Sequence, residues 1–185
     1  MNHWRKALLL CCFVFLLLTG GKAQQSGAGA NYAATFTKSD LEGRWFLLKT
    51  SLHKWAKGKK NKVTYQFANQ SQQGSAIEET ISYTSSDRTM NEQARFYSLA
   101  VKEFSERMTG GMHVTGRHWY VVAMDPGKQW LIIYVGGTFF HKDAIQLLCR
   151  TPQLTHEAEM QISKLFEENY FLHAKTQKLH PIIQQ

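Results

Sequence analysis

Cysteine is scarce in this sequence, and its placement excludes an intrachain disulfide in the predicted mature chain. Only 3 of the 185 residues are cysteines. Cys11 and Cys12 lie in an N-terminal apolar segment that we expect to be removed, which leaves Cys149 alone. A single thiol could be reactive or could be a buried apolar side chain, and its neighbours Leu147 and Leu148 favour burial. The roughly 160 remaining residues are enough to bury a core without covalent cross-links.

The sequence also lacks a hydrophobic run long enough to span a membrane. Its longest run, Ala7 to Leu18, has 12 residues, whereas a spanning helix needs about 20. Arg5 and Lys6 precede the run, and Gly21 and Ala23 occupy the positions expected of small residues at a cleavage site. This pattern predicts a signal peptide over residues 1–23 and a secreted protein, extracellular or periplasmic, without a membrane anchor.

Common signatures of catalysis, metal binding and nucleic-acid binding are missing as well. The sequence has no Ser-His-Asp order and no pair of catalytic carboxylates, so we predict no enzyme activity, catalytic residue or cofactor. We predict no metal site, because even His113 and His118 are five residues apart. The basic residues concentrate in one loop without an RNA- or DNA-binding module, so no nucleic-acid partner is expected. The residues do not predict an oligomeric state.

The chain that follows the predicted signal peptide is organised as one domain with two loose ends. Residues 24–38, rich in Gly, Ala, Ser and Gln, predict a flexible N-terminal arm. Residues 39–172 contain the patterned segments and make up the predicted domain. Residues 173–185 are polar and basic, and we expect a flexible tail there.

Short apolar or alternating segments separated by turn residues predict a meandering antiparallel sheet. Two of them, 62–69 and 76–84, have one apolar and one polar face. Segments 118–124 and 129–135 are apolar on both faces and therefore need a cover on their outer side. The predicted strands are 43–51, 62–69, 76–84, 94–100, 102–108, 111–116, 118–124, 129–135 and 144–150, and we expect two segments between 94 and 116 to form one bent strand.

One amphipathic helix follows the last predicted strand. Thr155 can cap its first turn, and apolar residues then recur at helical spacing at Ile162, Leu165, Phe166 and Tyr170. The apolar face of this helix needs a surface to pack on. We therefore expect the helix to cover the two strands that are apolar on both faces.

Three separated motifs resemble the signature regions of the lipocalin family. They are a Gly-x-Trp motif at Gly43 to Trp45, the segment His118 to Pro126 followed by Trp130 to Tyr134, and Ile145 to Leu154 directly before the helix. The last two motifs are most similar to the branch of apolipoprotein D and the bacterial outer-membrane lipocalin. The resemblance implies an all-β fold: an eight-stranded, up-and-down antiparallel β-barrel with one C-terminal α-helix packed on its outside.

The resemblance also implies structural roles for three residues. Trp45 would plug the closed end of the barrel, and Arg150 would lay its guanidinium against the indole of Trp45, a cation–π contact. Gly43 would let the entering chain pass close to the barrel floor. We assign these residues to stability and not to ligand binding.

The resemblance further implies a secreted binding or transport protein that carries a small hydrophobic or amphipathic ligand inside the barrel. One alternative is an isomerase or synthase that acts on a lipid in the same cavity. Another is a barrel filled by its own side chains, whose outer face binds a protein. The ligand-binding candidates are Leu47, Tyr65, Phe67, Ile81 and Tyr83, with Tyr120 or Val121 and Tyr134 or Ile133 from the strands that are apolar on both faces.

A basic loop lies between the first two predicted strands, where lipocalins have a lid over the open mouth. Lysines there would attract an anionic group, Trp55 could close over an apolar tail, and Lys49, predicted to face inward, could meet a carboxylate. The pattern favours a fatty acid or another amphipathic anion, and the alternative is a solvated loop. Contact of the Lys54 to Lys62 loop with an anionic membrane surface is compatible with a ligand-capturing loop and with a solvated loop. The lysines of this loop are Lys54, Lys57, Lys59, Lys60 and Lys62.

Overall fold

The computed structural model describes residues 36–57, 59–69, 76–100, 103–106, 117–137 and 142–184. The predicted signal peptide over 1–23, most of the predicted arm over 24–38 and the predicted strand 111–116 lie outside these residues. Within the described ranges, no helix has the length and apolar character needed to cross a membrane.

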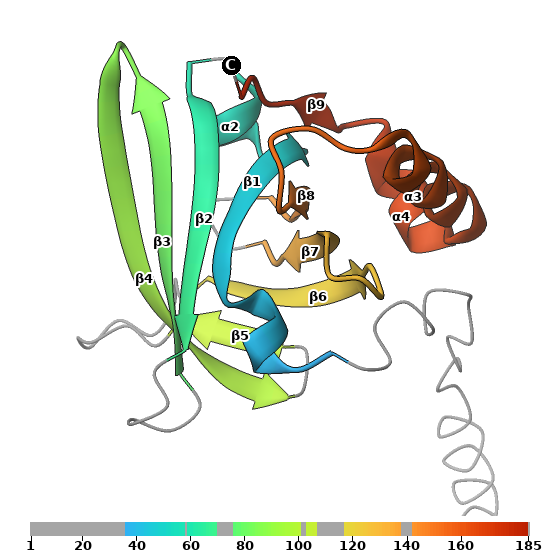
Figure 1. Cartoon of the computed structure of the whole chain (residues 1–185), viewed down its shortest axis with the longest axis horizontal. Helices are drawn as coiled ribbons and strands as arrows, with labels where there is room; N and C mark the ends of the chain where they lie inside the picture. Colours follow the sequence, from blue (N-terminus) through green and yellow to red (C-terminus); the bar gives the residue numbers. More distant parts are fainter. Residues whose placement is uncertain are drawn as a thin grey trace, which may run out of the picture.

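Eight antiparallel strands close into an up-and-down barrel (Figure 1). Each strand pairs with the next along the chain, and β1 pairs with both β8 and β2, which closes the wall. The predicted fold class is therefore confirmed. The strands are β1 (Gly43–Thr50), β2 (Asn61–Asn69), β3 (Ala76–Ser85), β4 (Arg88–Ala100), β5 (Glu103–Glu106), β6 (His118–Met124), β7 (Trp130–Val135) and β8 (Ala144–Cys149).

The region between β3 and β5 differs from the sequence prediction. The predicted segments 94–100 and 102–108 are two separate strands, since Phe96 of β4 lies opposite Glu106 of β5. They are therefore not the two segments of the expected bent strand, and the pairing of 102–108 with 111–116 lies outside the described residues. β4 also begins earlier than predicted, directly after a two-residue turn at Ser86 and Asp87. Both turn residues have positive φ, 49° and 63°, which is the geometry of a tight hairpin turn. The turn contains no glycine, and this is why the sequence pattern did not reveal it.

Alternation along the strands divides the buried apolar residues into two clusters. Val63, Tyr65 and Phe67 of β2 belong to the cluster inside the barrel. Trp130 and Ile132 of β7 belong to a second cluster on the outer side of the wall, which also contains residues of the C-terminal helices. The expectation that a helix covers the outer faces of β6 and β7 is thus confirmed.

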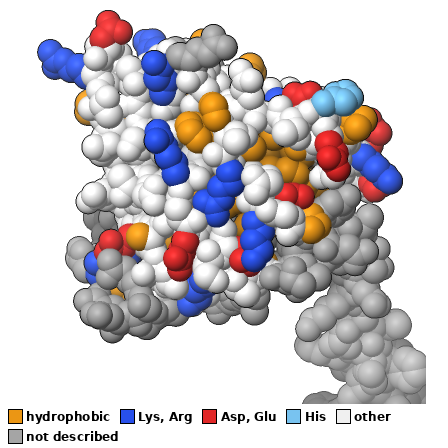
Figure 2. Space-filling model, in the orientation of Figure 1, with side chains coloured by type: hydrophobic (Ala, Val, Ile, Leu, Met, Phe, Trp, Pro, Cys, Tyr) orange, Lys and Arg blue, Asp and Glu red, His pale blue; other side chains and the backbone are white. Residues whose placement is uncertain are grey.

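The C-terminal helical segment consists of two helices, α3 (His156–Glu168) and α4 (Tyr170–Thr176), which lie beside the barrel (Figure 1). Figure 2 shows apolar atoms in the groove between barrel and helices. The Oγ1 atom of Thr155 accepts a hydrogen bond from Ala158 N at 3.2 Å, which confirms the predicted cap. Tyr170, predicted to be on the apolar face, is 88% exposed. The reason is that α3 ends and Asn169 caps a new helix, in which Leu172 is the buried residue.

Residues 173–184 have defined structure, in contrast to the flexible tail predicted for 173–185. β9 (His180–Pro181) pairs with the end of β1 beyond Phe46, where β1 no longer pairs with β2. Ile182 is 7% exposed and belongs to the interior cluster. The Gln184 side-chain amide donates to the carbonyl oxygens of both Leu47 and Val63, at 2.6 and 3.3 Å. Residues 180–184, here called the C-terminal strap, therefore bridge β1 and β2 at the end of the barrel that carries α2 (His53–Ala56) (Figure 1).

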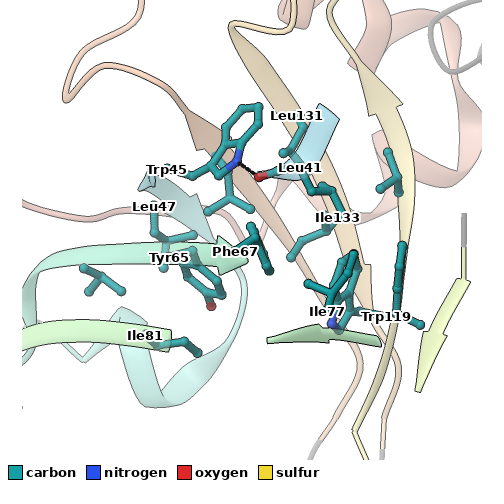
Figure 3. Packing of buried hydrophobic residues seen from close by; sticks show 14 of the residues in the cluster. Leu41, Trp45, Leu47, Tyr65, Phe67, Ile77, Ile81, Trp119, Leu131 and Ile133 are labelled. Atoms are coloured by element: carbon teal, nitrogen blue, oxygen red, sulfur yellow. Dashed lines mark hydrogen bonds between the residues drawn. The ribbon is translucent and has the colours of Figure 1, made fainter. Parts of the chain in front are cut away.

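The opposite end of the barrel is closed by Trp45 and the 3-10 helix η2 (Lys38–Leu41). The Trp45 indole N–H donates to the Leu41 carbonyl at 2.7 Å (Figure 3). The Arg150 guanidinium lies 3.7 Å from the Trp45 ring centroid. Gly43 has a φ of 96°, and a Cβ there would approach the Arg150 guanidinium to 3.0 Å. The contacts that the resemblance implies for Gly43, Trp45 and Arg150 are present.

Asp40 links η2 to the β6–β7 turn and is 6% exposed. Its carboxylate accepts a hydrogen bond from Thr37 N at 2.7 Å and forms an ion pair with Lys128. Burial alone would raise the pKa of Asp40, but the hydrogen bonds from Lys128 and Thr37 outweigh burial and lower this pKa below its usual value. Deprotonated Asp40 is therefore favoured by folding.

This linkage predicts a defined acid sensitivity. A carboxyl whose pKa is lowered by folding stabilises the protein above its unfolded-state pKa of about 3.9, and this contribution is lost as pH falls through the folded-state value. Asp40→Asn should reduce stability at neutral pH by about 1 kcal/mol, because Lys128 is half exposed and partly screened. It should also flatten the loss of stability below about pH 4. Urea unfolding across pH measures both effects, with Asp87→Asn in the exposed β3–β4 turn as the control. An unchanged acid slope in Asp40→Asn would contradict the assignment.

Candidate ligand-binding cavity

A cavity of about 640 Å³ lies inside the barrel and reaches the end that carries α2. Its apolar wall comes from Ile81 of β3, Trp119 of β6 and Ile133 of β7, with Trp55 of α2 at the mouth. A volume of this size matches the pockets that hold small molecules in proteins. The described barrel is thus hollow in part, which argues against the alternative of a barrel filled by its own side chains.

The aromatic rings of the interior are concentrated next to this cavity. Trp119 stacks on Phe104 with ring centroids 4.3 Å apart, and its ring lies 5.7 Å from those of Phe67 and Phe96. Figure 3 shows Phe67 and Trp119 among the packed side chains of the interior. Such edge-to-face and stacked pairs stabilise one packing arrangement. They form a rigid wall against which a ligand can bind.

Six of the predicted ligand-binding residues are inside the barrel, and three of these line the cavity. The lining residues are Trp55, Tyr65 and Ile81. Leu47, Phe67 and Tyr83 are buried in the same interior cluster but do not line the cavity. Their ligand-binding role remains a prediction, and in the structure these three support the wall.

Lys49 does not face inward as predicted. The register of β1 against β8 shifts between Leu47 and Lys49, so that Lys49 lies opposite Leu147, a residue of the outer cluster. Lys49 is exposed and does not line the cavity. The inward-face prediction is wrong because a β-bulge interrupts the alternation from which it was made.

Tyr120 and Tyr134 also lie outside the barrel. Their rings are 4.9 Å apart, and Tyr134 packs against Phe171, which contacts the outer cluster. Val121 and Ile133 take the inward positions instead. The sequence left both pairs open because these strands are apolar on both faces, and only the packing of the helices decides which residue is outside.

Trp55 is held at the mouth by aromatic and cationic neighbours. Its indole is fully buried and meets Tyr83 edge-to-face, with centroids 5.1 Å apart. The ammonium groups of Lys54 and Lys60 lie 4.5 and 4.6 Å from its ring centroid, within cation–π range. Both lysines also pair with Glu92, at 3.1 and 3.6 Å. The loop between β1 and β2 is thus anchored around Trp55, and of its five lysines only Lys54 lines the cavity.

The sequence did not predict the polar contacts that several side chains form inside the barrel. The Tyr65 hydroxyl donates to the Gln146 side-chain oxygen at 3.0 Å. The carboxylate of Glu79 is 3% exposed and lies 3.3 Å from the Arg117 guanidinium. Burial raises the pKa of Tyr65, and the charge of Glu79 raises it further, so the phenol stays protonated as a donor. The signal for Glu79 was present in the sequence, because it shares the strand parity of Ile77 and Ile81.

Basic side chains from three separate segments meet at the mouth. Lys54 comes from α2, Lys142 from the segment before β8, and Lys178 from the segment after α4. Within the described residues Lys142 and Lys178 form no ion pair, and both are exposed. His53 and His180 also line the cavity. No local motif marks these residues, since they are brought together only by barrel closure and by the C-terminal strap.

The carboxylate at the mouth is already engaged. Asp143 pairs with Lys175 and accepts a hydrogen bond from the Tyr134 hydroxyl at 2.9 Å. The hydrogen bond from Lys175 lowers the pKa of Asp143, and the one from Tyr134 adds to this. Burial, together with Asp143, raises the pKa of Tyr134 to about 12. Asp143, Lys175 and Tyr134 thus join α4 to the barrel. Because Asp143 is paired with Lys175, it does not neutralise the exposed ammonium groups of Lys142 and Lys178 at the mouth.

Cys149 is buried, as its apolar neighbours predict. It belongs to the outer cluster beneath the helices, and its sulfur lies 3.4 Å from the Thr151 hydroxyl. It does not line the cavity. Among the residues that the structure describes, no group of three His, Cys, Asp or Glu side chains could hold a metal ion.

Comparison with known proteins identifies the fold. No family model matches the chain, and no curated protein shows significant sequence similarity to it. Among solved structures, apocrustacyanin C1 is similar with a TM-score of 0.62 and 12% identity over 86% of this chain and 87% of that one. Lobster apocrustacyanin A1 gives 0.62 and 11% over 86% and 87%. The siderocalin Ex-FABP, described as functioning through dual ligand specificities, gives 0.57 and 14% over 79% and 95%.

These similar structures are lipocalins, and the barrel described here has the lipocalin fold. At 11–14% identity the likeness concerns the fold alone. The narrower placement beside apolipoprotein D and the bacterial outer-membrane lipocalin remains a prediction from the sequence motifs.

Proposed function

We propose that this protein is a secreted carrier that holds a small hydrophobic or amphipathic ligand in the barrel cavity. The observation that supports this most directly is the cavity of about 640 Å³ with an aromatic and aliphatic wall. Removing the apolar surface of a ligand from water contributes about 25 cal/mol per Å², before the cost of ordering the ligand. Hydrophobic burial therefore supplies the affinity.

The charge at the mouth supports an anionic ligand group. Lys142 and Lys178 are exposed at the cavity entrance without a paired carboxylate among the described residues. Clustered ammonium groups raise the local concentration of an anion and increase its capture rate. A fatty acid or a related amphipathic anion thus matches both parts of the site, with its tail against the wall and its head between the lysines.

A titration with a fluorescent long-chain carboxylate tests this function. The wild type should bind saturably with one site per chain. Lys142→Gln/Lys178→Gln should weaken binding by about tenfold at low salt and reduce its salt dependence, because two solvent-exposed ion pairs are lost. Lys57→Gln/Lys59→Gln is the matched control, since it removes the same charge from exposed lysines that do not line the cavity.

Two outcomes of this titration would contradict the proposal. Absence of saturable binding to the wild type would exclude the carrier function for long-chain carboxylates. Equal losses in the two double variants would show that the mouth lysines act only through net charge.

The basic loop is proposed to contact anionic membrane surfaces during ligand exchange. Lys57 and Lys59 are exposed there, and lysines near an anionic surface contribute about 1 kcal/mol each. The control variant Lys57→Gln/Lys59→Gln should therefore lose cosedimentation with phosphatidylserine vesicles. If it sediments like the wild type, the loop has no part in membrane contact.

A further inference from the structure

More cations than carboxylates line the cavity. Its lining contains two carboxylates and five lysine or arginine side chains. Three of the five cations form ion pairs within the described protein, and these pairs are Glu79 with Arg117, Asp143 with Lys175, and Glu92 with Lys54. The charges of Lys142 and Lys178 therefore remain without a counter-ion among the residues that the structure describes. Two positive charges at one mouth call for a negative group supplied from outside the chain.

These two lysines flank the end of β1. Thr50, the last residue of β1, lies between Gln146 of β8 on one side and His180 of β9 on the other (Figure 1). Lys142 precedes β8 by two residues, and Lys178 precedes β9 by two residues. A lysine side chain is long and carries three donors on a flexible stem. Both ammonium groups can therefore approach one ligand group at the end of β1.

The number of unmatched charges bears on the kind of anion. A carboxylate carries one negative charge and leaves one of the two lysines without a counter-ion. A phosphate monoester carries about 1.5–2 negative charges at pH 7 and has three strong acceptor oxygens. Two carboxylates far apart on a ligand would place one charge against the aromatic and aliphatic wall, where it would lose its hydration. A single, doubly charged head group avoids this cost.

We propose that the ligand is an amphipathic phosphate monoester, with its phosphate bound by Lys142 and Lys178 at the end of β1 and its hydrocarbon chain in the cavity. This inference rests on the carrier function proposed above and specifies the head group of its ligand. Both lysines are exposed, so water and salt screen their ion pairs with the phosphate. The experiment must therefore isolate the contribution of the second negative charge.

Three probes with the same dodecyl chain isolate this charge. They are dodecyl phosphate, its singly charged methyl diester and dodecanoate, measured by isothermal titration calorimetry at about pH 8 and low salt. Dodecyl phosphate should bind about fivefold more tightly than either singly charged probe, and added salt should reduce this preference. If the singly charged probes bind and dodecyl phosphate binds no more tightly, the inference is overturned while the carrier function stands. If none of the three binds, the proposed function itself fails for amphipathic anions.

Inorganic phosphate distinguishes a free anion from the head group of an amphipathic ligand. Burial of the hydrocarbon chain should supply most of the affinity. Displacement of a bound fluorescent carboxylate should therefore need at least about 100-fold more inorganic phosphate than dodecyl phosphate. Equal potency of the two would show a site for the free ion and would overturn the assignment of an amphipathic ligand.

Lysine variants assign the preference to the two cations. Lys142→Gln/Lys178→Gln should bind dodecyl phosphate and its methyl diester equally, because the second negative charge no longer has a cation to meet. Lys57→Gln/Lys59→Gln is the matched control and should keep the preference, since these exposed lysines do not line the cavity. A preference that survives in Lys142→Gln/Lys178→Gln, or one that is lost equally in the control, would overturn the assignment to Lys142 and Lys178.

Discussion

The Arg150→Ala variant is expected to lose about 3 kcal/mol of unfolding free energy and to keep the ligand affinity of the wild type. The Arg150 guanidinium donates to the carbonyl oxygens of Asp40 and Arg44, at 2.9 and 3.2 Å, while lying against Trp45. Charge-assisted hydrogen bonds contribute about 1.5–3 kcal/mol, and the cation–π contact contributes about 0.5–2 kcal/mol. Because one guanidinium makes all three contacts, these contributions do not add in full, and the expected loss is about 3 kcal/mol.

The affinity should be unchanged because Arg150 does not line the cavity. Thermal unfolding and ligand titration of the same preparation separate stability from binding. Arg150→Lys is the graded control, since it keeps a cation over the indole but not the planar fork that reaches both carbonyl groups. Its stability should fall between those of the wild type and Arg150→Ala. A lost affinity with an unchanged melting temperature would contradict a purely structural role for Arg150.

Removal of residues 179–185 is expected to reduce the unfolding free energy by about 3 kcal/mol and to open the seam between β1 and β2. Burial of a side chain such as Ile182 contributes about 1.5–3 kcal/mol. The strap also satisfies backbone groups of both strands, because Ile182 N donates to Leu48 O at 2.9 Å and Lys62 N donates to Ile183 O at 2.7 Å. Without the strap, the Leu48 carbonyl and the Lys62 amide must form hydrogen bonds with water or remain without partners.

Urea unfolding measures the loss of stability, and hydrogen exchange measures the opening of the seam. The Lys62 amide should exchange faster in the truncated chain, because its acceptor is gone, whereas amides of the β3–β4 pairing should exchange as in the wild type. Gln184→Ala, which removes only the side-chain bridge, should cost about 1 kcal/mol. Wild-type stability together with an unchanged Lys62 exchange rate would show that the strap does not hold the two strands.

The accuracy of the sequence prediction varied with the kind of signal. For strands with one polar and one apolar face the sequence predicts the interior residues correctly, as for Val63, Tyr65 and Phe67 of β2, because alternation depends on the strand alone. Lys49 was assigned wrongly because a bulge shifts the alternation there. Tyr120 and Tyr134 could not be assigned, since both sides of their strands are buried and only the packing of the helices distinguishes them.

Local chemistry therefore accounts for the elements and the closed end of this protein. Turn residues, alternation and the Thr155 cap depend on neighbours in the chain, and the Gly43, Trp45 and Arg150 set was accessible through short motifs. Tertiary structure alone determines which residues line the mouth and how the C-terminal strap packs. Lys142 and Lys178 line one entrance, and Ile182 is buried between β1 and β2, only because barrel closure brings together segments that are distant in sequence. No local pattern encodes such contacts, since their free energy arises when the segments meet.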